Sequence, residues 1–207
     1  MSTAQTFNQR PAAPTELDTE AAWAAFARHN AASLAETIHL RTGATIQMRA
    51  IQPSDAERLQ EFHARLSPDT IVMRYFRVAP VLHAQDAWRL THLDYDRRMA
   101  LVATIGEGQD ERIIGVVRYE PLSDTEGELA FVVEDDWQGQ GISTKALSRL
   151  LRYARRHGYT AMSAVTMANN VRMRDVLTHT EYPCATRYED GCLRVTLDIS
   201  QPGSAHA

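Results

Sequence analysis

The sequence lacks the features that mark several classes of protein. Its 207 residues include only two cysteines, so no disulfide framework is indicated. No apolar run approaches the roughly 20 residues of a membrane-spanning helix, and no basic segment followed by an apolar core marks a secretory signal at the N-terminus. The formal net charge of −4 implies no general affinity for nucleic acid. We therefore expect a cytoplasmic protein that binds neither membranes nor nucleic acids.

A metal site is not indicated either. The eight histidines show no ligand spacing such as His-Glu-x-x-His, and two isolated cysteines make a weak case for zinc. Cys184 and Cys192 flank Glu189-Asp190-Gly191. If Asp190-Gly191 is a hairpin turn, Glu189 faces Cys192 and Cys184 lies well up the other strand, so a disulfide would be out of register.

What is present fits one globular domain with an extension. Hydrophobic residues make up 44% of the chain and charged residues 23%, which is ordinary for a folded protein. We expect residues 1–36 to be an N-terminal extension, disordered to Pro14 and helical from Thr15, then a domain over residues 37–200 and a tail over 201–207. Trp23 and Phe26 share a face of the helix, which we expect to pack on the outside of the domain or on a second copy, as a homodimer.

The residue patterns predict an α/β fold (α+β by some conventions) in which helices cover both faces of a mixed, mostly antiparallel sheet. A hairpin turn at 40–45 leads into a strand, and Ser54 with Glu57 reads as a capping box for the next helix. A helix between two strands implies one parallel pair. The expected strands are 46–51, 99–105, 112–119, 128–134 and 161–166, and the expected helices are 54–66, 67–75, 83–93, 141–157 and 170–177.

The chain is organised around the stretch from Asp136 to Lys145. An apolar strand leads into it and a helical pattern leads out, with Gly139 and Gly141 in the turn. The unpaired N–H groups and the dipole of a helix N-terminus attract an anion, most often a phosphate. The spacing fits neither a P-loop nor a dinucleotide fingerprint, because Thr144 stands where the latter needs glycine. A plain tight turn remains an alternative.

The stretch Gln138-Gly139-Gln140-Gly141-Ile142-Ser143 resembles the signature Gln/Arg-x-x-Gly-x-Gly/Ala of the GNAT acyltransferase superfamily. Ser143 departs from it, since Gly or Ala is usual there. The resemblance extends from about Leu40 to Ile199 and is closest to the GNAT domain of bacterial protein lysine acetyltransferases. It implies that acetyl-CoA is the co-substrate and that its pantetheine lies between two splayed parallel strands. The residues then expected to bind it are Val132, Val133, Gln138, Gly139, Gln140, Gly141, Ile142, Ser143, Thr144 and Asn170.

Glu128 is the candidate catalytic residue. By strand alternation it shares a face with Ala130 and Val132, where a carboxylate is unusual. Amide formation from a thioester needs a neutral amine, and a carboxylate of raised pKa would remove its proton. The resemblance assigns the same role to a glutamate at this place. The alternative is a solvent-facing glutamate at a strand edge.

Other polar residues have weaker cases. Asn170 is either a helix N-cap alone or a cap that also meets coenzyme A. Tyr182 and Tyr188 are candidate general acids, although Tyr182 is expected in the core and Tyr188 on the surface. Lys145 could meet a phosphate, but with Arg149 and Arg152 it more simply forms a solvated basic face.

Together these observations predict an acetyl-CoA-dependent N-acetyltransferase in which a primary amine attacks the thioester directly, without a metal. The resemblance favours a protein lysine as the acceptor. Two alternatives stay open: an acetyltransferase for a small amine, and a non-catalytic module that senses acetyl-CoA and acts through a partner.

Overall fold

The computed structural model of the chain describes residues 12–15, 18–31, 34–76 and 81–202. Most of the expected disordered start and most of the 201–207 tail lie outside these ranges. Within the described ranges, no helix has both the length and the apolar character needed to cross a membrane.

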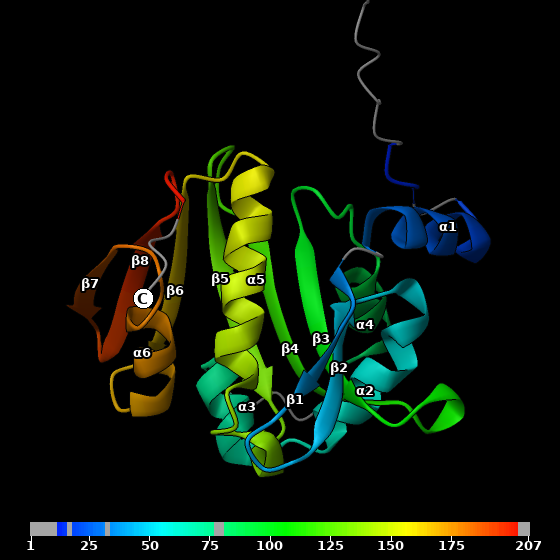
Figure 1. Ribbon diagram of the computed structural model, residues 1–207, viewed down its shortest axis with the longest axis horizontal. Helices are drawn as coiled ribbons and strands as arrows, with labels where there is room; N and C mark the ends of the chain where they lie inside the picture. Colours follow the sequence, from blue (N-terminus) through cyan, green and yellow to red (C-terminus); the bar gives the residue numbers. More distant parts are fainter. Residues whose placement is uncertain (1–11, 16–17, 32–33, 77–80, 203–207) are drawn as a thin grey trace, which may run out of the picture.

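One eight-stranded sheet forms the centre of the domain, with the strand order β1-β2-β3-β4-β5-β6-β8-β7 (Figure 1). Only β5 and β6 pair in parallel; all other neighbours are antiparallel. This confirms the expected mixed, mostly antiparallel sheet. The strands are β1 (Glu36–His39), β2 (Thr45–Ala50), β3 (Met99–Ile105), β4 (Arg112–Pro121), β5 (Glu126–Val133), β6 (Ala161–Met167), β7 (Cys184–Glu189) and β8 (Cys192–Asp198).

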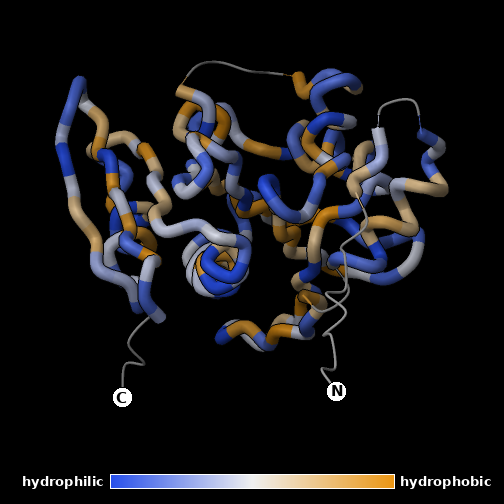
Figure 2. The backbone as a smooth tube through the Cα atoms, turned by 90° about the horizontal axis from the view of Figure 1, so that it is seen from above, coloured by the Kyte–Doolittle hydropathy of each residue, from blue (hydrophilic) through white to orange (hydrophobic). Residues whose placement is uncertain are grey.

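Helices cover both faces of the sheet, as expected. On one face α5 packs against β3, β4 and β5; on the other, α2 packs against β4 and α3 packs against β5 and β6. Figure 2 looks along α5 and shows apolar and polar positions on the same helix, whose buried residues include Ala146, Leu150 and Leu151. The helices are α1 (Glu20–Ala31), α2 (Ala56–Ala64), α3 (Pro68–Tyr75), α4 (Ala84–Thr91), α5 (Ile142–Arg156) and α6 (Val171–Thr178).

Two helix ends carry the caps that their sequences favour, whereas the start of α2 does not. Ser67 caps α3 by accepting from the Thr70 N–H, and Gly158 follows α5 with a φ of 87°. The expected capping box of Ser54 with Glu57 is wrong. Instead the Asp55 carboxylate accepts from the Gln52 N–H at 2.8 Å, because Pro53–Asp55 forms a 3₁₀ turn that starts the helix earlier.

The N-terminal helix is shorter than expected and its aromatic face is already covered. It ends at Ala31, and Glu36 lies in β1 rather than in the helix. Trp23 and Phe26 are 6% and 7% exposed within this chain. Trp23 makes edge contacts with Trp88 and with His92. The face that suggested a homodimer is therefore occupied by the chain's own core.

The cysteine hairpin has the expected register. Glu189 pairs with Cys192 and Cys184 pairs with Leu197, and both cysteines are free thiols. Asp190 and Gly191 both have positive φ, which fits a two-residue turn between twisted strands.

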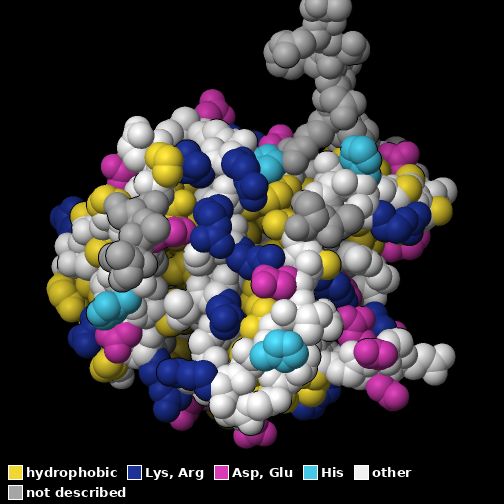
Figure 3. Space-filling model, in the orientation of Figure 1, with side chains coloured by type: hydrophobic (Ala, Val, Ile, Leu, Met, Phe, Trp, Pro, Cys, Tyr) yellow, Lys and Arg dark blue, Asp and Glu magenta, His cyan; other side chains and the backbone are white. Residues whose placement is uncertain are grey.

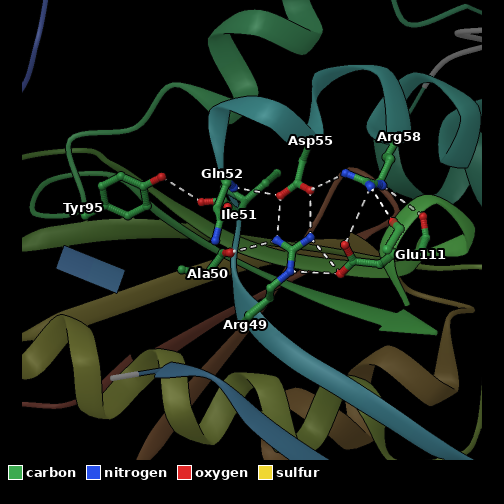
Figure 4. A network of polar contacts seen from close by, with 9 residues as sticks. Arg49, Ala50, Ile51, Gln52, Asp55, Arg58, Tyr95 and Glu111 are labelled. Carbon is green, nitrogen blue, oxygen red and sulfur yellow. Dashed lines mark hydrogen bonds and ion pairs between the residues drawn. The ribbon is translucent and has the colours of Figure 1, made fainter. Parts of the chain in front are cut away.

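A network of charges ties β2 to the start of α2 (Figure 4). Asp55 is fully buried and accepts two hydrogen bonds from the Arg49 guanidinium, at 2.7 and 2.8 Å. Glu111 accepts from the same guanidinium, and Arg58 donates to the Glu111 carbonyl. Burial alone would lower the pKa of Arg49, but the ion pairs with Asp55 and Glu111 raise it. This network was not predicted from the sequence, because its partners lie up to 62 residues apart.

Replacing Asp55 with Asn should destabilise the fold, because it leaves a largely buried arginine with one carboxylate fewer. We expect the free energy of unfolding to fall by about 3 kcal/mol, measured by urea denaturation. Asp86→Asn, at an exposed position on α4, is the matched control and should change stability by about 0.5 kcal/mol or less. Equal losses in both variants would contradict a special role for the network.

Candidate functional site

The candidate site lies where the two parallel strands part. Pairing between β5 and β6 stops at Glu128, which pairs with Ser163, although β5 continues to Val133. The Glu134 N–H donates to the Ile114 carbonyl on β4. By two-residue alternation the N–H groups of Phe131 and Val133 then face away from β4, into the opening toward β6. An extended ligand arm could bond there as a missing strand would.

The glycine turn lies at the far end of this opening. Gly139 and Gly141 have φ of 74° and 85°, and no heavy atom lies within 4 Å of where a β-carbon would stand on either. No side chain caps α5, and its first backbone bond runs from the Lys145 N–H to the Gly141 carbonyl. The preceding N–H groups of the first turn are therefore available to an anion. Open space above two left-handed glycines fits a phosphate group.

Two side chains hold the turn in place. Asp135 accepts from the backbone and the hydroxyl of Ser67 at 3.0 and 2.6 Å and from the Thr70 hydroxyl at 2.7 Å. Gln138 donates to the Val133 carbonyl and to Thr70, both at 3.1 Å. The turn is thus fastened both to the start of α3 and to the end of β5.

A cavity of about 1140 Å³ follows the opening from the turn to the middle of the sheet. Of the residues expected to bind the cofactor, all but Gln140 line it; the residues on this wall are Val132, Val133, Gln138, Gly139, Gly141, Ile142, Ser143, Thr144 and Asn170. The Gln140 side chain instead donates to the Asp136 carbonyl and accepts from Thr42. Its backbone remains part of the turn.

The structure also places the other polar candidates. Asn170 caps α6 by accepting from the Met173 N–H at 3.1 Å, and it also lines the cavity. Tyr182 is 4% exposed and Tyr188 is 63% exposed, and neither lines the cavity. Figure 3 shows basic side chains along the face formed by α5, where Arg149 pairs with Glu36 and Arg152 with Glu181.

Charged residues gather at the other end of the cavity, which we term the charged end: Arg74, Arg98, Arg118, Glu120 and Glu128. All of them except Arg98 line the cavity. Glu128 is exposed and pairs across the ladder with Glu120. Glu120 is held by Arg98 at 2.6 Å and by Arg118 at 3.3 Å. Of the two opposed carboxylates, Glu120 is therefore the one held in ion pairs.

Glu128 was predicted from the sequence, whereas the arginines around it were not. A signal for Arg118 was present, since it interrupts the apolar run from Ile113 to Tyr119 in an expected strand. Arg74 gave no such signal, because its helix pattern is ordinary. Its place in the cavity depends on how α3 lies across β5.

Comparison with known proteins identifies the domain type. Residues 45–182 match the family model described as "Acetyltransferase (GNAT) domain". The protein named Acetyltransferase PA5475 of Pseudomonas aeruginosa is 35% identical over 142 residues, which cover 66% of this chain and 74% of that protein. Acetyltransferase Pat of Mycolicibacterium smegmatis is 29% identical over 142 residues, covering 68% of this chain and 42% of that protein. The chain thus spans less than half the length of this second relative.

Solved structures agree with this match. The crystal structure of the GNAT domain of S. lividans PAT aligns with a TM-score of 0.73 and 32% identity, covering 81% of this chain and 98% of that one. The structure of yncA from Salmonella typhimurium, with its cofactor acetyl-CoA, aligns with a TM-score of 0.57 at 17% identity, covering 78% and 98%. The latter shows a shared fold alone.

The clamp of Asp135 on α3 predicts a pH dependence. Burial works against the charge, but hydrogen bonds from Ser67 and Thr70 lower the pKa of Asp135 below 3.8. A carboxylate whose pKa is lower in the folded state than in the unfolded state stabilises the fold at pH values above its unfolded-state pKa. This stabilisation is lost as the pH falls through the folded-state pKa. The stability advantage of wild type over Asp135→Asn should therefore shrink below about pH 4.

Because Asp135 is exposed, solvent screening keeps the effect small, at roughly 0.5 kcal/mol. Urea denaturation at pH 6 and at pH 2.5 measures it. Asp136→Asn is the control, because Asp136 is an exposed neighbour with no side-chain bond to a described residue. An advantage over Asp135→Asn that stays constant with pH would show that the carboxylate charge is irrelevant.

Proposed function

Because the chain belongs to the GNAT acetyltransferase family, we propose that it transfers the acetyl group of acetyl-CoA to a primary amine, with a protein lysine as the favoured acceptor. One observation carries the proposal. A glycine turn at a helix N-terminus and a carboxylate lie at opposite ends of one opening between parallel strands. From Val133 to Glu128 the strand rises about 17 Å, room for an extended arm between a phosphate site and a reacting carbonyl.

The residues present fit coenzyme A. Its pyrophosphate would lie on the N–H groups of Gly139 to Ser143, where the space for a β-carbon is empty at both glycines. The pantetheine would run along β5 beside the N–H groups of Phe131 and Val133. One of these groups would polarise the thioester carbonyl. Ser143 lines the cavity, and its side chain is small enough to leave room for a phosphate.

The reaction needs one bond made and one broken. The acceptor nitrogen attacks the thioester carbon, a C–N bond forms, and the C–S bond breaks to release the coenzyme A thiolate. An ammonium acceptor must lose two protons. Glu128 would take the first, directly or through water, to free the attacking lone pair, and the second passes to the departing thiolate. Orientation along the strand opening would supply much of the rate.

Glu128 is better placed for this role than its neighbour Glu120. Glu120 is committed to ion pairs with Arg98 and Arg118. Among the residues that the structure describes, none forms an ion pair with Glu128, which lies exposed in the cavity. A carboxylate without a fixed partner can exchange protons with a substrate.

The cavity rim supports a macromolecular acceptor. Met73, Phe76 and Val171 line the cavity and are 39%, 45% and 50% exposed. Exposed apolar side chains grouped beside a site favour a protein surface as partner. The sequence resemblance to the GNAT domain of bacterial protein lysine acetyltransferases points the same way. An enzyme that acetylates a small amine is the second candidate, supported by the charged residues at the far end of the cavity.

A non-catalytic sensor that acts through the aromatic face of α1 is less well supported. That face is buried in the chain's own core and would have to leave it before it could bind a partner.

Binding of acetyl-CoA is tested by thermal unfolding. A ligand at 100 times its dissociation constant adds roughly 2.7 kcal/mol, a rise of about 5 °C or more in the midpoint for a chain of this size. ADP, which has a pyrophosphate but no pantetheine, should give less. Gly141→Ala should reduce the acetyl-CoA shift, because the added carbon fills the space for the phosphate.

Gly158→Ala is the matched control for this variant. Gly158 has a φ of 87° and open space for a β-carbon, but it follows the opposite end of α5. The Gly158→Ala variant should lose a similar amount of stability from backbone strain but keep the acetyl-CoA thermal shift. If wild type shows no shift, the cofactor assignment is wrong.

Glu128→Gln tests the catalytic role. Losing the proton acceptor should lower kcat by 10²-fold or more while the acetyl-CoA thermal shift stays intact. Release of coenzyme A thiol with a lysine-containing peptide measures turnover. Glu126→Gln, two residues earlier on the same face of β5 and outside the cavity lining, should keep wild-type activity. Full activity in Glu128→Gln would refute a glutamate base.

A further inference from the structure

The charged end of the cavity is not neutral by itself, and we propose that it binds a carboxylate carried by the acceptor a few atoms from its reactive amine. The inference rests on the proposed acetyl transfer and names a property of its acceptor. Three observations carry it: a buried arginine with an unused terminal nitrogen, an excess of positive charge, and the spacing of Arg118 from Glu128.

Arg118 provides the unpaired donor. It is 5% exposed and lines the cavity. One terminal nitrogen donates to the Leu90 carbonyl at 3.0 Å and lies 3.3 Å from Glu120. Its Nε is buried and has no hydrogen-bond partner among the described residues. The other terminal nitrogen, Nη1, has no hydrogen bond or ion pair with a described residue and is not among the buried unpaired atoms. A ligand oxygen can therefore reach the guanidinium through Nη1, and its charge would offset the cost of burying this arginine.

The charge count favours an anion. Three arginines and two glutamates at the charged end leave one net positive charge, and the excess grows to two when Glu128 takes up the proton of the amine. Among described residues Arg74 has no ion pair; its guanidinium lies over the Tyr75 ring. An ammonium-bearing acceptor without a negative group would enter an already positive region. A nearby carboxylate offsets that repulsion.

Ionisation of the arginines agrees with this count. Burial lowers the pKa of Arg118 to about 10, Glu120 opposes the shift, and Arg98 and Arg74 add to it. Burial also lowers the pKa of Arg74, while Tyr75, Glu128 and Glu120 oppose the shift. Both side chains remain cationic at neutral pH, and a bound carboxylate would favour their charged forms.

The spacing limits the acceptor. Arg118 pairs with Ala130, and Glu128 precedes Ala130 by two residues on the same face. Such diagonal neighbours have β-carbons about 7 Å apart. Amine and carboxylate therefore belong to one acceptor and are separated by several bonds. Either a free ω-amino acid or a lysine beside an acidic residue in a protein meets this description.

Matched probes separate these sources. The small pair is 6-aminohexanoate and 6-aminohexanamide; the peptide pair has one lysine followed by Asp or by Asn. Release of coenzyme A thiol gives kcat and KM for each probe. Calorimetry with coenzyme A bound gives affinities for 6-aminohexanoate and its amide without requiring turnover. In wild type we expect at least about tenfold higher kcat/KM for the carboxylate form of the preferred pair, mostly through KM.

Arg118→Gln should abolish this preference by weakening the carboxylate probe alone. An unfolding midpoint near that of wild type verifies the fold of this variant. Arg74→Gln, on the half-exposed face of α3, is a second variant and should weaken the preference without a change in stability. Arg89→Gln, exposed on α4 and outside the cavity, is the control and should retain the preference.

The outcomes are distinct. Equal kcat/KM for both members of each pair in wild type overturns the carboxylate inference while leaving acetyl transfer intact. If Arg118→Gln loses kcat/KM equally for both probes of a pair, Arg118 has a structural role and the carboxylate inference is likewise overturned. No transfer to any of the four probes counts against the proposed function. Calorimetry then still decides the inference, because selective binding of 6-aminohexanoate supports it and equal binding of the amide refutes it.

Discussion

The site depends on one break in hydrogen bonding between two parallel strands. If β6 followed β5 past Glu128, the N–H groups of Phe131 and Val133 would be used by the sheet and no arm could enter. Backbone groups released in this way need partners. The Gln138 amide donates to the Val133 carbonyl at 3.1 Å, and the resulting turn carries Gly139 and Gly141 into place. The same break thus creates the arm-binding edge and orients the anion site at its end.

Holding the break open requires a rigid frame, and buried tyrosines supply part of it. Tyr119, Tyr153 and Tyr159 donate their hydroxyls to the carbonyls of Asp96, Tyr95 and Arg97, which all lie in one connection before β3. Burial raises the pKa of Tyr119 and Tyr159, so these hydroxyls stay protonated donors at neutral pH. Since Tyr153 lies on α5 and Tyr119 on β4, a single connection fastens the helix to the sheet.

Much of this arrangement could be predicted from local sequence. The strand, glycine turn and helix around Gly141 follow from patterns within some 20 residues, and the helix between β5 and β6 requires a parallel pair. What could not be predicted depends on distant contacts. Ser54 and Glu57 satisfy the capping pattern, but Arg49 draws Asp55 into an ion pair and moves the helix start. Trp23 is predicted to lie on the surface of the domain, because its partners in and after α4 cannot be identified from the sequence.

The charged end shows why site residues are harder to predict than the site itself. Glu120 and Glu128 look alike in sequence, and they face each other on neighbouring strands. Arg98 and Arg118 form ion pairs with Glu120 and keep it charged, whereas Glu128 has no ion pair among the described residues. A proton acceptor must be able to lose its charge, so the ion pairs decide which carboxylate can act. The same arginines then leave a positive surplus that acts on the acceptor, which links the choice of base to the choice of substrate.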